Sequence, residues 1–144
     1  MSENLYRHPA AARIDLDRPA YRRAVTHVLG CGQAEEIVVE MWNPVQLDNG
    51  GWVCPLRVER FDTFGAFPGR DPLDALLNAM SVARWLFNDR PGKFRWEDRD
   101  YGGFPLLLDV GLPEPVHAGV ERKALDARND AWSAYGVPRF EMGV

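Results

Sequence analysis

Few side chains in this sequence have the types and the spacing that metal binding requires. The three histidines, His8, His27 and His117, lie far apart in the sequence. His27 and Cys31 are four residues apart, a spacing that places two zinc ligands on one face of a helix. However, we expect Gly30 to end that helix, and no further Cys or His pair completes a tetrahedral site. The sequence therefore predicts no metal ion and no cofactor.

The best candidates for paired catalytic carboxylates are Asp71 and Asp74. Their position at the start of an apolar run favours another role, with Asp71 as the N-cap of a helix and Asp74 as a negative charge in its first turn. The chain lacks the Gly-x-Ser-x-Gly motif of a nucleophile, and it also lacks phosphate-loop and dinucleotide-binding glycine patterns. We therefore assign no catalytic residues, and a non-enzymatic function is favoured.

One segment, residues 90–103, combines the residue types that are enriched at protein interfaces. Loops of this length without structure of their own are usually functional or disordered. The acidic residues of the segment offset its basic ones, which disfavours nucleic-acid binding. The alternative is that its aromatic side chains pack back on the core while its charges pair with one another. The predicted partner-binding residues are Arg90, Lys93, Phe94, Arg95, Trp96, Asp98, Arg99 and Tyr101.

The element expected to position this segment is a central helix over residues 72–88. Its apolar residues recur around nearly the whole circumference, which is typical of a buried helix. Asp71 is a good N-cap, and Pro72 is well placed at the first helical position. A second hypothesis places a small-molecule pocket between this helix and a sheet, and the candidate pocket residues are Asp74, Asn78 and Arg84.

The sequence predicts an antiparallel hairpin over residues 36–60. Apolar residues alternate on both sides of the turn signal Asp48-Asn49-Gly50-Gly51. If the chain folds back about Asn49 and Gly50, the apolar faces of the two strands coincide. The facing pairs are then Met41 with Val58, Val45 with Cys54, and Leu47 with Trp52.

The remaining elements complete an α+β fold in one domain, residues 1–144. We expect a loose arm over residues 1–16, a helix over 18–29 and a final helix over 120–135. Because the strands precede the central helix, the sequence favours helices packed on an antiparallel sheet over a parallel βαβ arrangement.

Composition limits the functional classes. The formal net charge of −4 is mild and has no basic region, so a nucleic-acid partner is not expected. No stretch approaches the roughly 18 consecutive apolar residues of a membrane span, and the first residues lack the apolar core of a signal peptide. We therefore predict a cytoplasmic protein without membrane attachment, in which Cys31 and Cys54 are free thiols.

The motif pattern resembles a family of small bacterial proteins of unassigned function. The pattern consists of Trp42-x-Pro44, Trp52-x-Cys54-Pro55 and Gly69-x-Asp71-x-Leu73-x-Ala75-Leu76. The resemblance covers about residues 36–88, and the sequence departs from it by Pro72 and by extensions at both ends. The resemblance implies a bacterial, cytosolic α+β domain of the kind also seen among toxin-immunity proteins, and it implies no catalytic residues.

These observations lead to two main hypotheses of different classes. The first is a non-catalytic protein-binding module, more specifically an immunity protein that neutralises a partner toxin. The second is a small-molecule-binding protein or enzyme that uses the pocket described above. A homodimer that uses residues 90–103 as its interface is a third hypothesis.

Overall fold

The computed structural model describes residues 8–88, 90, 92–97, 103, 104, 114–134 and 136, without the side chains of residues 114 and 117. The chain forms two compact units, Met1–Leu107 and Leu108–Val144, each of which is described by itself. The fold is α+β, as the sequence predicts, with an antiparallel sheet and helices. A single domain over residues 1–144 stays a prediction.

Among the described residues, the sheet of the first unit has six strands, and β4 lies inside it. β5 pairs with one edge of β4, while β2 and the short β3 pair with the other edge, and the order then continues through β1 to β6. All of these pairings are antiparallel. The strands are β1 (Tyr21–Val28), β2 (Ala34–Met41), β3 (Val45–Gln46), β4 (Trp52–Val58), β5 (Thr63–Gly69) and β6 (Lys93–Arg95).

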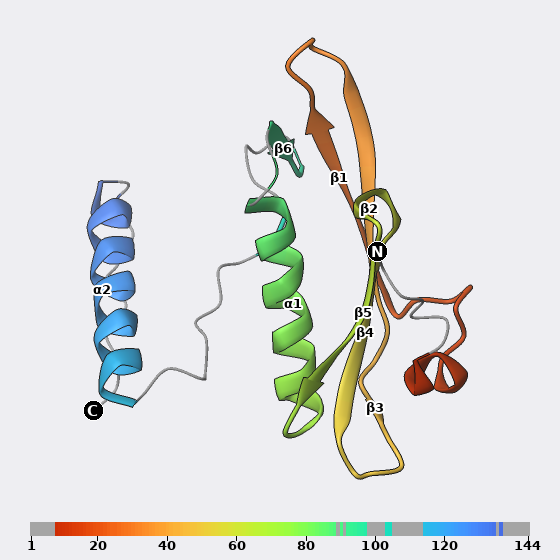
Figure 1. Ribbon diagram of the computed structural model, residues 1–144. Coiled ribbons are helices and arrows are strands. Elements are labelled where there is room, and N and C mark those ends of the chain that lie inside the picture. Colours follow the sequence, from red (N-terminus) through yellow and green to blue (C-terminus); the bar gives the residue numbers. More distant parts are fainter. Residues whose placement is uncertain are drawn as a thin grey trace. The chain divides into compact units, whose positions relative to one another are not determined.

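The central helix α1 spans Pro72–Asn88, the range that the sequence predicts, and packs on β4 and β5 on one face of the sheet (Figure 1). Three alanines one turn apart, Ala75, Ala79 and Ala83, are fully buried, and their small side chains let the helix approach the strands closely. The expectation of burial around the whole circumference is wrong, because Leu73 and Trp85 on the opposite side are exposed.

The junction between β5 and α1 is closed by a close approach and a cap. A Cβ atom added at Gly69 would lie 2.1 Å from the backbone nitrogen of Ala75, so only glycine fits there. The amide N–H of Asp74 donates a 2.7 Å hydrogen bond to Oδ1 of Asp71, as expected for an N-cap. Gly69, Asp71 and Ala75 therefore fix the angle at which the chain leaves the sheet and enters the helix.

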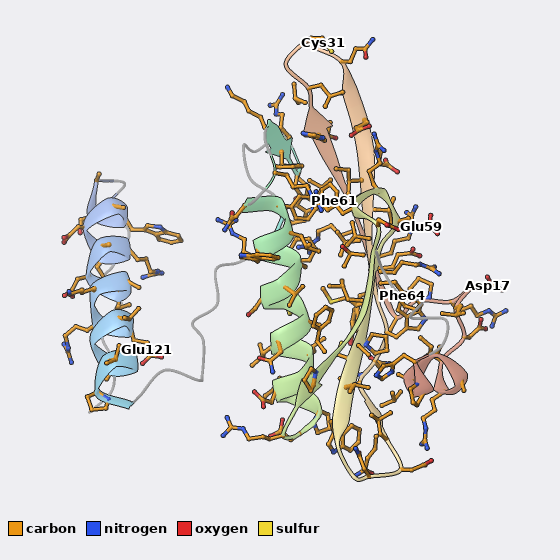
Figure 2. All side chains as sticks on the ribbon, in the orientation of Figure 1. Asp17, Cys31, Glu59, Phe61, Phe64 and Glu121 are labelled. Atoms are coloured by element: carbon orange, nitrogen blue, oxygen red, sulfur yellow. The ribbon has the colours of Figure 1, made fainter. Side chains whose placement is uncertain are left out.

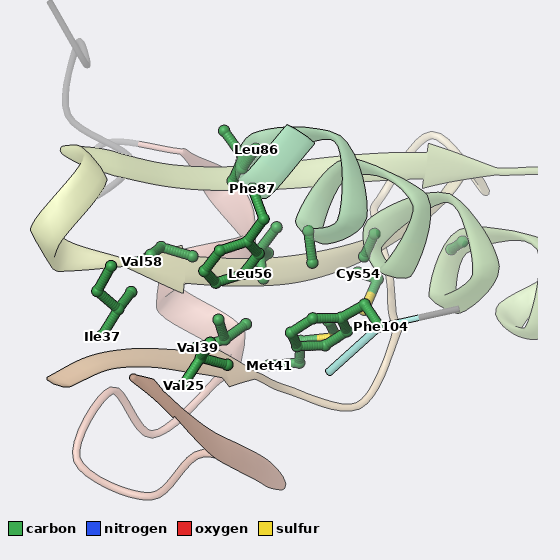
Figure 3. Close-up of a cluster of buried hydrophobic side chains, with 13 residues drawn as sticks. Val25, Ile37, Val39, Met41, Cys54, Leu56, Val58, Leu86, Phe87 and Phe104 are labelled. Atoms are coloured by element: carbon green, nitrogen blue, oxygen red, sulfur yellow. The ribbon is translucent and has the colours of Figure 1, made fainter. Parts of the chain in front are cut away.

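The hydrophobic core lies between α1 and the sheet (Figure 3). It receives alternate residues from the three neighbouring strands, which is the periodicity of a half-buried strand. Leu86 and Phe87 of α1 and Phe104 complete it. The strand residues of the core are Val25, Ile37, Val39, Met41, Cys54, Leu56 and Val58.

The predicted helix over residues 18–29 is wrong, because this segment forms β1. Arg23, Val25 and His27 pair with Val39, Ile37 and Glu35 of β2, so alternate side chains face α1. A turn connects the two strands, and its Gly32 has a φ of +84°, which glycine adopts without strain. The period of 3.6 seen in the sequence is overridden by pairing along eight residues of β2.

The predicted register of the 36–60 hairpin is also wrong. Met41 pairs with Leu56, and Val45 pairs with Val53. The turn is the cause, because Leu47 donates to the carbonyl oxygen of Gly51 at 2.8 Å and closes a loop of three residues with Gly50 at a φ of +86°. Because this loop has an odd number of residues, the partner of Val45 lies one residue away from the predicted Cys54. The partner of Met41 lies two residues away from the predicted Val58, and a shift by two residues keeps the Met41 side chain on the core face.

The second face of the sheet is partly covered by the segment before β1, where the sequence predicts a loose arm. Residues Pro9–Arg13 form a 3-10 helix, η2, on the side of the sheet opposite α1 (Figure 1). The indole N–H of Trp42 donates to the carbonyl oxygen of Asp15 at 2.7 Å, and the guanidinium of Arg57 donates to that of Leu16 at 3.0 Å. Residues 8–16 are therefore attached to the sheet, whereas residues 1–7 lie outside the described residues.

The second unit contains the helix α2 (Glu114–Ser133), which begins six residues before the predicted 120–135 helix. Its Arg128 guanidinium lies 4.5 Å from the ring centre of Trp132. Tyr135, at the predicted end of the helix, is outside the described residues.

Candidate protein-binding surface

The predicted partner-binding segment contains an unexpected strand, β6, which pairs with β1 at the sheet edge. Its middle residue, Phe94, points inward and packs edge-on against Phe87, with 4.9 Å between the ring centres. Phe94 also stacks on the ring of His27 at 4.5 Å. Because side chains alternate along a strand, Lys93 and Arg95 point away from this cluster, and both are exposed.

His27 is held from several sides. Its Nδ1 lies 3.1 Å from Oε1 of Glu35, and the other oxygen of that carboxylate binds Arg60 at 2.9 Å. Hydrogen bonds hold the pKa of Glu35 below its usual value, and the bond from Arg60 has a larger effect than the bond from His27. The backbone at Gly92 passes over the imidazole, since a Cβ atom there would lie 2.5 Å from Nε2 of His27.

This arrangement gives His27 a role in positioning β6. Cys31, the other member of the candidate metal pair, lies exposed in the turn between β1 and β2 (Figure 2). No group of three or more His, Cys, Asp or Glu side chains is placed to hold a metal ion within the described ranges. The absence of a metal and of a cofactor stays a prediction.

Two more aromatic contacts hold the ends of the segment. The guanidinium of Arg23 lies 4.2 Å from the ring centre of Trp96 and donates a hydrogen bond to the carbonyl oxygen of Gly103. The guanidinium of Arg90 lies 4.1 Å from the ring centre of Phe61. Such cation–π contacts add to the pairing of β6 with β1 and restrain the described residues of the segment.

The eight predicted partner-binding residues thus fall into three groups. Phe94 and Trp96 are half-buried and pack on the rest of the first unit, as the alternative reading of the segment expects. The exposed residues are Arg90, Lys93 and Arg95, and we call them the β6 surface. The residues that lie outside the described part of the chain are Asp98, Arg99 and Tyr101.

The three residues of the alternative pocket, Asp74, Asn78 and Arg84, are hydrogen-bonded to residues 68–70 or to Phe104. Asp74 accepts from the backbone and side chain of Arg70 at 2.8 and 3.3 Å, and these bonds hold the pKa of its carboxyl below the usual value. The amide of Asn78 donates to the carbonyl oxygen of Pro68 at 2.7 Å, whereas Arg84 donates to that of Phe104 at 3.2 Å. These side chains therefore attach α1 to the segments on either side of it.

Two features of this region were missed by the sequence reasoning. Arg23 lies in the segment predicted as a helix over residues 18–29, although it belongs to β1 and its guanidinium supports Trp96. The exposed face of α1 was taken to be buried, although the spacing of Ala75, Ala79 and Ala83 marks the closely packed face and so places larger side chains opposite it.

Comparisons with protein-family models, with curated proteins and with solved structures return no match to this chain. Within the described residues, no helix has both the length and the apolar character needed to cross a membrane. The family resemblance, the bacterial origin and the cytoplasmic location accordingly stay predictions.

Proposed function

We propose that this protein is a non-catalytic protein-binding module and that the β6 surface contacts its partner. The observation that carries the proposal is the two-sided construction of β6. Phe94 is held among the rings of His27, Phe61 and Phe87, while the cationic residues on either side of it are exposed.

Rigid support of exposed charges favours recognition. A charged side chain on a fixed strand loses less conformational entropy on binding than one on a free loop. The three cations of the β6 surface suit a partner with an acidic patch, and arginine can form two parallel hydrogen bonds with a carboxylate. Charge complementarity of this kind increases selectivity and the association rate more than affinity.

The family resemblance extends the proposal to an immunity protein that neutralises a partner toxin. The alternative, a small-molecule pocket at Asp74, Asn78 and Arg84, has less support because each side chain is hydrogen-bonded to a segment that borders α1. We therefore favour the protein-binding module over the small-molecule pocket.

A charge-reversal experiment tests the module. The full chain, carrying an affinity tag, is produced in cells of its natural source, and proteins enriched over an untagged control are identified and purified. The variant Lys93→Glu/Arg95→Glu should weaken binding of the purified partner by about 30-fold or more, as expected for interface residues worth roughly 2 kcal/mol. The melting temperature should remain close to that of the wild type, because both side chains are exposed.

The matched control is Arg18→Glu/Lys123→Glu, which changes the net charge by the same amount at two other exposed positions. This control should bind within about threefold of the wild type, since isolated surface charges contribute little. Equal loss of binding in both double variants would contradict the proposed surface, and the absence of any enriched protein would contradict the module itself. For the immunity role, the partner should be toxic when expressed alone and harmless when co-expressed with this protein.

A further inference from the structure

The face of the sheet opposite α1 is covered over only part of its area by the described residues. Residues 8–16 contact β4 on this face, and the indole of Trp42 is bonded to them. Farther along the face, on β1 and β2, the side chains of Ala24, Thr26 and Ala34 are exposed. The side chains of β1, β2 and β6 that point away from α1 form a continuous surface, which we call the outer sheet face.

Two apolar cross-strand pairs lie on the outer sheet face. Ala24 pairs with Val38, and Val28 pairs with Ala34. The face of an antiparallel sheet that meets water commonly carries polar side chains, so apolar pairs at these positions mark an area of contact. Because the four side chains are small, they leave room for larger ones. The area therefore fits a partner that supplies bulky apolar side chains.

Cationic side chains flank this apolar area at both ends. Lys93 pairs with Val28, and Arg95 pairs with Thr26, so both cations of β6 point to the outer sheet face. Arg22 lies on the same face at the other end of β1 and is exposed. The proposed binding site at β6 is thus continuous with the apolar pairs and with a further cation.

The acidic residues of this face limit where a partner's carboxylates can lie. Glu40 accepts a 3.0 Å hydrogen bond from Arg57, and both side chains are largely buried. Glu36 is exposed and pairs with Thr26, between the two apolar pairs. Carboxylates of a partner are therefore attracted at the ends of the apolar area and repelled at its middle.

We propose that the outer sheet face binds an α-helix of the partner, with large apolar side chains over the two apolar pairs and with acidic residues towards both ends of the helix. This inference rests on the proposed function and specifies the chemistry of the partner. A helix fits because it satisfies its own backbone hydrogen bonds and can pack on the face of a sheet, as α1 does on the opposite face, whereas an added strand needs an edge. The distance along β1 from Arg22 to Val28 is about 20 Å, the length of about thirteen helical residues.

Substitutions in the full chain test the position of the contact, with the purified partner as the ligand. Ala24→Tyr should weaken binding about tenfold or more, because its ring fills the space that the partner's side chains need. Tyrosine is favourable in strands, so the melting temperature should stay close to that of the wild type. The matched control, Ala124→Tyr, makes the same change at an exposed position of α2 and should bind within about twofold of the wild type.

The cation at the far end of the area gives an independent test. Arg22→Glu should also weaken binding about tenfold or more, whereas Arg122→Glu at an exposed position of α2 should stay within about threefold of the wild type. Normal binding by either Ala24→Tyr or Arg22→Glu overturns this inference. If Lys93→Glu/Arg95→Glu weakens binding in the same experiment, the proposed function still stands, and the partner then contacts β6 alone.

Charge-swap rescue tests the helix. Each surface Asp and Glu of the partner is replaced in turn by arginine, and each variant is tested for restored binding to Arg22→Glu. Rescue should come from an acidic residue towards one end of a helix whose apolar residues recur with a period of 3.6, because opposite charges are then paired again. Rescue by residues outside helices only, or by none, overturns the inference.

Discussion

Replacement of Gly69 by alanine should be among the most damaging single-methyl additions to this protein. The added Cβ atom would lie 2.1 Å from the backbone nitrogen of Ala75, 2.5 Å from its Cα and 2.6 Å from the carbonyl carbon of Asp74. All three atoms belong to the first turn of α1. Because no side chain can rotate to relieve these contacts, the helix itself must move away from β5.

The magnitude follows from two contributions. Overpacking of a filled site costs about 1–3 kcal/mol, and the upper end applies because the atoms in contact are backbone. Displacement of the first turn also disturbs the 2.7 Å cap between Asp74 and Asp71, which is worth about 1 kcal/mol. We therefore expect Gly69→Ala to lower the free energy of unfolding by about 3–4 kcal/mol, a large part of a typical total of about 5–15 kcal/mol.

Urea unfolding followed by circular dichroism measures this change. The matched control is Gly30→Ala, since a Cβ atom at Gly30 would meet nothing within 4 Å. That variant should stay within about 1 kcal/mol of the wild type, and restriction of the unfolded chain gives it a slight gain. If Gly69→Ala unfolds at the same urea concentration as the control, the close approach of β5 to α1 does not limit this fold.

Three further measurements test other parts of the structure. Asp71→Ala should cost about 1 kcal/mol in urea unfolding, and an effect as large as that of Gly69→Ala would show that Asp71 does more than cap the helix. Because Arg60 and His27 lower the pKa of Glu35, ionised Glu35 stabilises the fold at neutral pH, and this contribution is lost as the pH falls below the usual carboxyl value of 4.5. Arg60→Gln should accordingly lower the melting temperature at pH 7, and the difference from the wild type should shrink in acid; a constant difference would contradict this origin. Burial raises the pKa of Cys54 to about 11, so a thiol reagent at pH 8 should modify only the exposed Cys31 in the folded protein and both cysteines in denaturant.

Local sequence signals were sufficient for the central helix. The preference of Asp71, Pro72 and Asp74 for the start of a helix depends only on near neighbours in the sequence. In agreement with it, α1 begins at Pro72. The α+β class also followed from the order of the elements along the chain. These predictions succeeded because hydrogen bonds within one helix turn and the period of apolar residues are properties of short segments.

Features that depend on distant partners were decided by the tertiary structure. Residues 21–28 carry a helical pattern, but eight pairs with β2 make them a strand. Next to the turn, the hairpin register depended on one residue in the length of the loop, because Leu47 bonds to Gly51. The side of α1 that is buried was likewise set by the sheet, which covers Ala75, Ala79 and Ala83 and leaves Leu73 and Trp85 exposed.

The candidate site shows the same division. Composition pointed to the segment after α1, and its exposed cations are Arg90, Lys93 and Arg95. The sequence could not show that Phe94 faces inward, because its direction follows from pairing with His27, more than sixty residues earlier in the chain. A three-residue strand has too short a pattern to specify its own faces, so β1 and the aromatic cluster determine which of its side chains are exposed.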